Sequence, residues 1–356
     1  MIIAVDCRMF DASGIGVYLR GCLSCLISTN NEFILLGDIK KLQSFSSLQN
    51  VKLIKCKVKP FSVYELFFFP FNLTKQINKA DVYFSPFFNI PRGIKIPVFT
   101  TIHDIIFPDM PELFSNICVT VRMWFYHRAL KLSKKIFTVS QFSKSRIEHY
   151  FGNKKEVIVT YSAIQPMFLE YHVNPKNIKK ENTIIFIGNI KKHKGLDCLI
   201  DAFILAKKEG LPHKLIIVGS KDNFRSRDNS VIKKIETLSE NAVIFTGNIS
   251  DETLINYLSS ASLLVQPSLY EGFCLPPLEA MILGTQVLIS DILVLKEIYA
   301  GYPVIFFRAG DTNDLKKKLL DILNKPARSL LLSENLIHKY TFDKTASIIA
   351  ENIREL

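Results

Sequence analysis

The sequence predicts an α/β protein built from two doubly wound domains with parallel sheets. Its 356 residues exceed the usual size of one domain, and strand-like runs alternate with helical segments along nearly the whole chain. Many of these runs contain only Val, Ile, Leu and Phe, which is typical of parallel strands buried on both faces. The composition, 48% hydrophobic and 22% charged, is that of an ordinary globular protein.

The short apolar runs are the predicted strands. They lie at residues 2–5, 33–36, 51–54, 82–85, 98–102, 135–139 and 157–161 in the first half, and at 184–187, 215–218, 243–246, 263–265, 287–290 and 304–306 in the second. Between the halves, residues 166–182 are polar, contain Pro175 and end in a lysine-rich run, so a linker is predicted there. We therefore expect a first domain at 1–165, a second at 183–341 and a final helix at 342–356.

Bulk properties narrow the classes of function. The formal net charge of +12 implies an anionic partner, such as nucleic acid, anionic lipid or a phosphorylated small molecule. No nucleic-acid-binding motif accompanies the charge, so no nucleic-acid partner is expected. No apolar run reaches 18 residues, and residues 1–6 resemble a first strand and not a signal peptide, so a cytoplasmic protein is expected. The seven scattered cysteines are interpreted as core thiols without disulfides.

Residues 263–291 indicate a strand, a loop, a helix at about 275–283 and a second strand, which together form a βαβ unit. Ligands of such sheets bind beyond the C-terminal ends of the strands, beside helix N-termini. Glu271 lies in this loop, and Glu279 lies about one turn into the helix, where an acidic residue also simply compensates the helix dipole. The residues whose N–H groups start the helix are Gly272, Phe273, Cys274 and Leu275. Such N–H groups suit polyhydroxylated or anionic ligands.

Two further strand ends in the second half carry glycine. After the strand at 184–187, Gly188 leads into a loop that ends in Lys194 and a glycine before the next helix. Cations at a helix start are suited to a diphosphate, although a plain basic loop would have the same composition. After the strand at 243–246, Gly247 and Asn248 form another turn at the same predicted edge.

The first half offers fewer candidates. Gly14 and Gly16 follow the first strand and would allow a ligand close to the backbone, although a simple strand–helix turn explains them equally well. His103 and Asp104 follow the strand at 98–102; a lone histidine is usually structural, and Asp104 is expected to hold its loop by hydrogen bonds. Ser140 is a candidate N-cap of the next helix.

The stretch Glu-Gly-Phe-x-Leu-Pro-x-Leu-Glu-Ala-Met, at residues 271–281, followed by Gly-Thr and a strand, resembles the signature of the family 4 retaining glycosyltransferases. That resemblance implies the GT-B fold, in which two Rossmann-like domains face a cleft, the first binding the acceptor and the second the nucleotide sugar. It also implies a final helix that crosses back to pack on the first domain. The resemblance extends over most of the chain.

The resemblance assigns roles to the candidates. It implies catalytic roles for His103, Glu271 and Lys194, with His103 and Glu271 near the donor sugar and Lys194 at its diphosphate. The implied substrate-binding residues are Gly14, Gly16, Gly188, Gly247, Asn248, Gly272, Phe273, Cys274, Leu275 and Glu279, of which Glu279 would hold the ribose hydroxyls. No metal or cofactor is expected, since the chain has no D-x-D motif and Lys194 with helix N-termini would stabilise the leaving diphosphate.

Four positions depart from the family pattern. Val17 replaces a basic residue that often follows the second glycine, and Asn189 and His193 stand where the family often has arginine. Cys274 replaces a glycine found in many relatives. These departures leave Lys194 as the main expected cation of the phosphate site.

Within the family, the combination of His-Asp-x-x-Phe-Pro at 103–108 with the Ser140 motif is most similar to bacterial mannosyltransferases of O-antigen, lipopolysaccharide and other surface polysaccharides. The expected donor is a nucleotide-diphosphate sugar such as GDP-mannose, and the expected acceptor is a glycan or lipid-linked oligosaccharide. The aromatic and basic stretch 117–135 would then suit peripheral contact with the anionic cytoplasmic face of the inner membrane, or simply a helix with its aromatic face in the core.

Two alternatives remain open at this stage. One is a different nucleotide-sugar enzyme of GT-B fold, such as an epimerase, which would yield free sugar nucleotides and need no membrane acceptor. The other is a non-catalytic binding protein that retains the fold.

Overall fold

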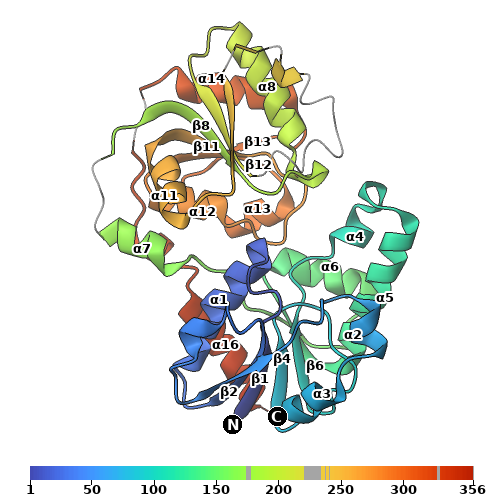
Figure 1. Ribbon diagram of the computed structural model, residues 1–356. Coiled ribbons are helices and arrows are strands. Elements are labelled where there is room, and N and C mark those ends of the chain that lie inside the picture. The colour runs from blue at the N-terminus through green and yellow to red at the C-terminus, as the bar shows by residue number, and fades with distance from the viewer. Residues whose placement is uncertain (174–177, 220–233, 237, 240, 327–328, 356) are drawn as a thin grey trace. The chain divides into compact units, whose positions relative to one another are not determined.

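The computed structural model describes residues 1–173, 178–219, 234–236, 238–239, 241–326 and 329–355. The chain divides into two compact units, each an α/β unit around a parallel sheet (Figure 1). Unit 1 comprises Met1–Gln165 together with Tyr340–Leu356, and unit 2 comprises Pro166–Lys339. Among the described residues, no helix is both long and apolar enough to cross a lipid bilayer.

The sheet of unit 1 has the strand order β3-β2-β1-β4-β5-β6-β7, and all its neighbours pair in parallel. Its strands are β1 (Ile2–Asp6), β2 (Glu32–Gly37), β3 (Val51–Lys55), β4 (Val82–Ser85), β5 (Val98–Thr101), β6 (Ser133–Thr138) and β7 (Val157–Val159). Its helices are α1 (Ser13–Ile27), η1 (Gln43–Phe45), α2 (Val63–Phe67), α3 (Phe71–Ile77), α4 (Ile106–Asp109), η2 (Pro111–Leu113), α5 (Asn116–Leu132), α6 (Gln141–Phe151) and α16 (Phe342–Arg354). Strands β2 and β3 join the sheet on one side of β1, and β4 to β7 join it on the other. The strand order therefore reverses at the β1–β4 pair.

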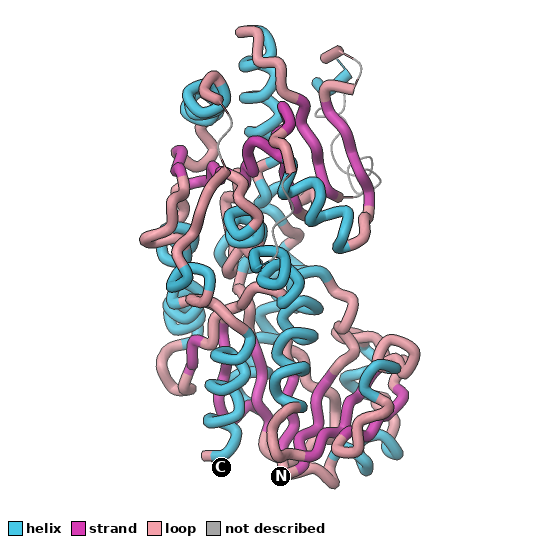
Figure 2. The backbone as a smooth tube through the Cα atoms, turned by 90° about the vertical axis from the view of Figure 1, so that its left-hand side faces the viewer, coloured by secondary structure: helices cyan, strands magenta, loops and turns pink. Residues whose placement is uncertain are grey.

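The last helix, α16, belongs to unit 1 because it packs on α1. A Cβ on Gly21 of α1 would meet the ring of Phe342 at 2.2 Å, so glycine is required where these helices touch. Lys135 of β6 reaches the far end of α16, where its Nζ lies 2.6 Å from Glu355 Oε2. Both chain ends consequently lie at the same end of unit 1 (Figures 1 and 2).

The sheet of unit 2 has the order β10-β9-β8-β11-β12-β13, again with parallel pairing throughout. Its strands are β8 (Glu181–Ile187), β9 (Lys214–Val218), β10 (Val243–Gly247), β11 (Ala261–Gln266), β12 (Gln286–Ser290) and β13 (Ile305–Phe307). Its described helices are α7 (Pro166–Val173), η3 (Lys192–Lys194), α8 (Leu196–Lys208), α11 (Asp251–Ser260), α12 (Pro276–Ile282), α13 (Leu293–Ile298), α14 (Thr312–Leu323) and α15 (Glu334–Ile337). Here the strand order reverses at the β8–β11 pair, which marks the expected ligand crevice of this unit.

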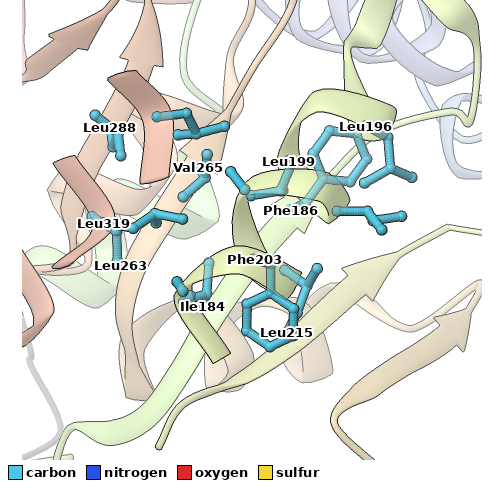
Figure 3. Packing of buried hydrophobic residues seen from close by; sticks show 14 of the residues in the cluster. Ile184, Phe186, Leu196, Leu199, Phe203, Leu215, Leu263, Val265, Leu288 and Leu319 are labelled. Atoms are coloured by element: carbon cyan, nitrogen blue, oxygen red, sulfur yellow. The ribbon is translucent and has the colours of Figure 1, made fainter. Parts of the chain in front are cut away.

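The core of unit 2 forms where α8 covers the sheet (Figure 3). Leu199 and Phe203 of α8 stand four residues apart on one helical face and pack against Ile184 and Leu263 of the central strands. All four side chains are fully buried, and burial of each such side chain contributes about 2 kcal/mol. This packing fixes the carboxyl ends of β8 and β11, from which the site is built.

Each predicted strand overlaps a strand of the structure, and the predicted two-unit parallel α/β architecture is confirmed. The segment 166–182 differs from the expected linker, because it contains helix α7 and the start of β8 and lies within unit 2. The reason is apolar packing, since Phe168 of α7 is completely buried. The candidate N-cap Ser140 is confirmed, because its hydroxyl accepts a hydrogen bond from the Ser143 N–H at 3.0 Å.

Candidate functional site

The central feature of unit 2 is an ion pair at the reversal point of its sheet. Lys194 ends η3, which follows β8, and Glu271 lies in the loop after β11. The Lys194 Nζ lies 2.7 Å from Glu271 Oε1 and 2.8 Å from Oε2. Ser268 donates its hydroxyl to the same carboxylate, at 2.7 Å from Oε1. Two residues that the sequence predicts for the site are thus in direct contact although they are 77 positions apart.

Burial and charge act in opposite directions on Glu271. Burial alone would raise the pKa of its carboxyl, but Lys194 and the Ser268 hydroxyl outweigh that effect and hold the pKa below its usual value. The neighbouring His193 is half-buried, and burial together with the Lys194 charge lowers its pKa to about 4. His193 is therefore neutral at physiological pH, which leaves the partly buried Lys194 as the cation next to Glu271.

Backbone contact holds the two loops in register. The N–H of Leu269, in the β11 loop, donates to the carbonyl of His193 at 2.7 Å. Gly195 has a φ of +66°, and a Cβ there would lie only 1.9 Å from the carbonyl oxygen of Pro267. Only glycine permits this approach, so Gly195 brings the Lys194 side chain to Glu271.

The loop beyond Glu271 leads into α12. Within the described part of the chain, the N–H groups of Gly272, Cys274 and Leu275 make no hydrogen bond. Cys274 adopts a φ of +76°, a conformation that favours glycine, and its carbonyl accepts a hydrogen bond from the Tyr299 hydroxyl. Phe273, also predicted for the site, is buried beside them. The loop thus presents backbone donors next to the Lys194–Glu271 pair.

Glu279 lies in the first turn of α12, as the sequence predicts, and its side chain is 6% exposed. Its carboxylate makes no hydrogen bond to the described residues. Burial, with a smaller contribution from Asp251, raises the pKa of Glu279 to about 8. At neutral pH this group is therefore mainly a protonated carboxyl, able both to donate and to accept hydrogen bonds.

The predicted glycines of unit 2 meet at the same sheet edge. Gly188 donates its N–H to the carbonyl of Val218, and a Cβ on Gly219 would lie 2.8 Å from the Gly188 carbonyl oxygen. Gly219 in turn forms an isolated bridge with Gly247, whose φ is +69°. The ends of β8, β9 and β10 therefore approach backbone to backbone, while Asn248 is exposed beside them.

In unit 1, His103 follows β5 and lies in a largely apolar setting. Its Nε2 is 2.8 Å from the carbonyl oxygen of Pro86, and since a carbonyl only accepts, Nε2 carries the proton. Burial lowers the pKa of His103 to about 4, so the ring is neutral with Nδ1 as an acceptor. The Tyr18 ring packs edge-on against it with centroids 4.9 Å apart. At pH 7 the neutral ring can accept a hydrogen bond from a sugar hydroxyl, but it has no extra proton to donate as a general acid.

The N-terminal glycines have different surroundings. Gly16 is buried in α1, and a Cβ there would lie 2.5 Å from the carbonyl oxygen of Phe10. Close packing therefore explains the glycine at this position. Gly14 is exposed, and nothing lies within 4 Å of a Cβ built on it, so the fold itself does not require glycine there. Asp104 accepts a hydrogen bond from the Ile106 N–H at 3.2 Å, as predicted.

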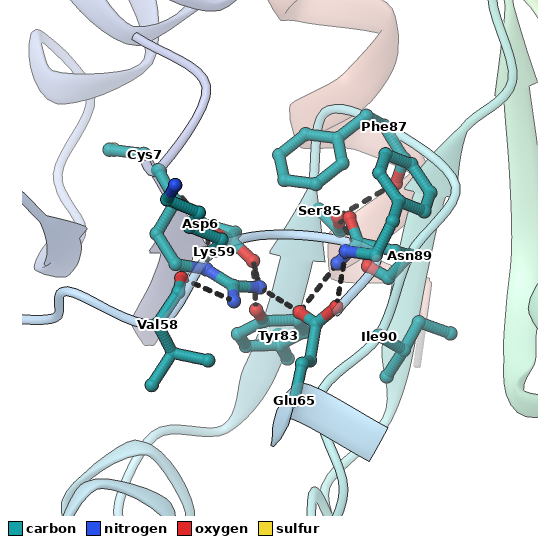
Figure 4. Close-up of polar contacts among 12 residues, drawn as sticks. Asp6, Cys7, Val58, Lys59, Glu65, Tyr83, Ser85, Phe87, Asn89 and Ile90 are labelled. Carbon is teal, nitrogen blue, oxygen red and sulfur yellow. Dashed lines mark hydrogen bonds and ion pairs between the residues drawn. The ribbon is translucent and has the colours of Figure 1, made fainter. Parts of the chain in front are cut away.

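A buried ionic cluster at the reversal point of the unit 1 sheet was missed by sequence reasoning (Figure 4). Arg8, just after β1, pairs with Asp6 and with Glu65 of α2, both at 2.5 Å. Tyr83 of β4 donates to Asp6 at 2.6 Å, and the Asn89 amide donates to Glu65 at 2.5 Å. Asp6 and Glu65 are completely buried. A carboxylate at the end of an otherwise apolar strand was the one signal available in the sequence.

The two α/β units, each built on a parallel sheet, define a protein of GT-B fold. Residues 169–339 match the family described as glycosyl transferases group 1. Over about two thirds of its length the chain is similar to O-antigen mannosyltransferases.

Individual relatives support this assignment. O-antigen chain mannosyltransferase B of Escherichia coli is 28% identical over 67% of this chain and 63% of its own length. O-antigen chain mannosyltransferase RfbU of Salmonella typhimurium is 26% identical over 72% of this chain and 69% of its own. Less than two thirds of the Escherichia coli protein is therefore matched.

Solved structures show the same fold over the full chain. Anabaena Alr3699/HepE, solved in complex with UDP and glucose, matches with a TM-score of 0.72 and 18% identity, covering all of both chains. Sucrose-phosphate synthase from Thermosynechococcus elongatus matches with a TM-score of 0.73 and 17% identity over all of this chain and 98% of its own. At such low identity the likeness concerns the fold alone.

Proposed function

We propose that the protein is a retaining glycosyltransferase of family 4. It moves a hexose from a nucleotide-diphosphate sugar to a glycan or lipid-linked oligosaccharide acceptor in the synthesis of bacterial surface polysaccharide or lipopolysaccharide O-antigen. The reaction takes place at the cytoplasmic face of the inner membrane, where such acceptors are extended. Mannose from GDP-mannose is the first candidate, because the named O-antigen relatives are mannosyltransferases.

The observation that carries the proposal is the Lys194–Glu271 pair at the β8–β11 reversal point. This is where an open parallel sheet binds its ligand. The pair joins a compact cation, suited to phosphate, to a carboxylate, suited to sugar hydroxyls. The N–H groups of Gly272, Cys274 and Leu275, which make no hydrogen bond to the described residues, add donors beside it.

The main chemical demand of glycosyl transfer is to stabilise a departing diphosphate and an oxocarbenium-like sugar. In the proposed reaction Lys194 neutralises the diphosphate charge that a metal ion would otherwise neutralise, so the reaction is metal-independent. Glu271 interacts with the positive sugar, and its lowered pKa supports this role because it favours the ionised carboxylate. Glu279 binds the ribose hydroxyls in this proposal, and its protonated carboxyl supports that role.

The proposal is tested by thermal unfolding with GDP, UDP, ADP, dTDP and their common sugars. A ligand that binds only the native state stabilises it by about 2.7 kcal/mol at a hundred times its Kd. We expect one nucleotide and its sugar to raise the Tm selectively. The increase should be lost in Glu279→Ala and Lys194→Ala, each compared with its own ligand-free Tm, and kept in the matched control Lys317→Ala on exposed α14 surface.

The stabilising donor then defines the transfer assay. Incubation with a lipid-linked acceptor should give a product whose anomeric configuration, read by NMR, equals that of the donor. Inversion would overturn the retaining assignment, and a changed sugar nucleotide formed without acceptor would favour an epimerase. Absence of any thermal shift in well-folded protein would favour a non-catalytic binding protein.

A further inference from the structure

A group of large apolar side chains, most of them aromatic, faces solvent on α2, on the residue after it and at the start of α3. Val63, Tyr64, Phe67, Phe68 and Phe71 are 68%, 55%, 57%, 64% and 81% exposed. Soluble proteins rarely leave so many large apolar side chains together at the surface unless they bind something. The exposure follows from the local fold, since the inward positions of the same segment are occupied by the buried residues Glu65, Phe69 and Leu73.

The strand end next to these helices is strongly basic. Lys55, Lys57 and Lys59 are all exposed and alternate with the more buried Cys56 and Val58. Together with Ser62, Tyr64 and Leu73 they line a hollow of about 610 Å³. The three lysines and Tyr64 therefore border one depression in the surface, and Phe67, Phe68 and Phe71 belong to the same short segment of the chain.

No carboxylate from this segment offsets the positive charge. Residues 51–80 contain six lysines and a single acidic residue, Glu65. Glu65 is completely buried and paired with Arg8, so it does not reach the surface. The combination of exposed aromatic side chains with unopposed lysines matches the chemistry of an anionic bilayer interface.

We propose that this α2–α3 surface, formed by Val63, Tyr64, Phe67, Phe68 and Phe71 with Lys55, Lys57 and Lys59, docks on an anionic lipid bilayer. The aromatic rings enter the headgroup region while the lysines bind lipid phosphates around them. The inference goes beyond the proposed sugar transfer, because such docking does not depend on any activity of unit 2.

A second copy of the chain is a poorer occupant. A symmetric contact through the same surface would bring the lysines of both copies together, and juxtaposed like charges cost several kcal/mol. The membrane contact at residues 117–135 stays a prediction. Phe125 and Tyr126 of that stretch are buried in the core, as the alternative of an inward aromatic face requires, whereas Ile117, Val121, Trp124 and Leu132 are exposed.

The test is co-sedimentation of the full chain with vesicles of phosphatidylcholine alone or with 40% phosphatidylglycerol. The wild type should bind only the anionic vesicles, and binding should weaken in high salt. Because each lysine near an anionic surface contributes about 1 kcal/mol, Lys55→Ala/Lys57→Ala/Lys59→Ala should bind about a hundredfold more weakly. Phe67→Ser/Phe68→Ser/Phe71→Ser should also lose most binding.

Two control variants carry substitutions of the same kind on unit 2. Lys208→Ala/Lys214→Ala/Lys317→Ala removes three exposed lysines, and Leu293→Ser/Leu331→Ser removes two apolar side chains that are 70% and 88% exposed. Both controls should bind anionic vesicles like the wild type, and all variants should keep its Tm.

The proposal is overturned if the wild type does not bind anionic vesicles, or if the controls lose as much affinity as the α2–α3 variants. It is also overturned if the wild type is a dimer without lipid and the aromatic variant is a monomer, since the surface would then join two copies. Nucleotide-induced thermal shifts should be equal in the wild type and the α2–α3 variants. Failure to bind vesicles would therefore not contradict the proposed sugar transfer. Failure to bind any nucleotide would likewise not contradict the proposed membrane docking.

Discussion

Replacing Lys194 by methionine removes the positive end of the Lys194–Glu271 pair while keeping a side chain of similar length. Glu271 would lose its cation but keep the hydrogen bond from Ser268, in a site where its own side chain is 9% exposed. Breaking a buried pair in this way costs about 3–5 kcal/mol. Since the Lys194 side chain is 20% exposed and partly screened, we expect a loss near the low end, about 3 kcal/mol at pH 7.5.

The size of this loss should depend on pH in a defined direction. In the wild type the pKa of Glu271 lies below its usual value, so the pair contributes stability above the unfolded pKa and loses it as pH falls through the folded pKa. Without Lys194, burial raises the pKa of Glu271 above its usual value. The carboxyl then takes up a proton as pH falls, and the cost of burying a lone charge disappears. The difference between wild type and Lys194→Met should shrink by at least about 1 kcal/mol between pH 7.5 and pH 5.

Urea unfolding followed by far-UV circular dichroism measures this difference. The single tryptophan, Trp124, lies in α5 of unit 1, so its fluorescence provides an internal control that should not change if the units unfold separately. The double variant Lys194→Met/Glu271→Gln should recover about 2 kcal/mol at pH 7.5, because no lone charge remains. A loss below 1 kcal/mol for Lys194→Met, or an equal loss at both pH values, would refute the reasoning.

Three further changes have defined outcomes. Burial raises the folded pKa of Glu279 to about 8, so its contribution to stability is present at low pH and is lost as pH rises from about 4 through 8. The stability of Glu279→Gln should therefore depend less on pH. In denaturant titrations at pH 8.5 this variant should be about 2 kcal/mol more stable than the wild type. Gly195→Ala should cost at least about 3 kcal/mol and abolish nucleotide-induced thermal shifts, because its Cβ would collide with the carbonyl of Pro267, whereas Gly14→Ala should stay within about 0.5 kcal/mol. Cys274→Gly should raise the free energy of unfolding by up to about 1 kcal/mol, because glycine adopts the positive φ of this position without strain. If the variant is instead less stable than the wild type, the packing of the thiol outweighs the strain.

The strands were predictable because their signal is local. Runs such as 184–187 and 263–265 are apolar at every position, and the structure buries both within the central strands of unit 2. The helical start of unit 2 was missed because prolines and polar residues dominate 166–182, although Met167, Phe168 and Leu169 stand together as an apolar cluster.

Pairing between distant residues could not be predicted in the same way. Lys194 and Glu271 were both expected at the site, but their contact depends on the close approach of the Gly195 and Pro267 backbones. Arg8 resembles an ordinary exposed cation in the sequence, and only the folded chain brings Glu65 to it across 57 positions. Such contacts depend on tertiary packing, which no local pattern encodes.

The Arg8–Glu65 pair also has a mechanical consequence. Helix α2 has only five residues, far fewer than the 12–15 or so that an isolated helix needs in water, so its shape depends on what holds it. Glu65 joins the helix to Arg8, and through Arg8 to the rigid end of β1. A force on Phe67 or Phe68 is therefore transmitted through the Glu65–Arg8 ion pair to β1. If these rings insert into a bilayer interface, the orientation of α2 on the membrane also sets the orientation of the unit 1 sheet.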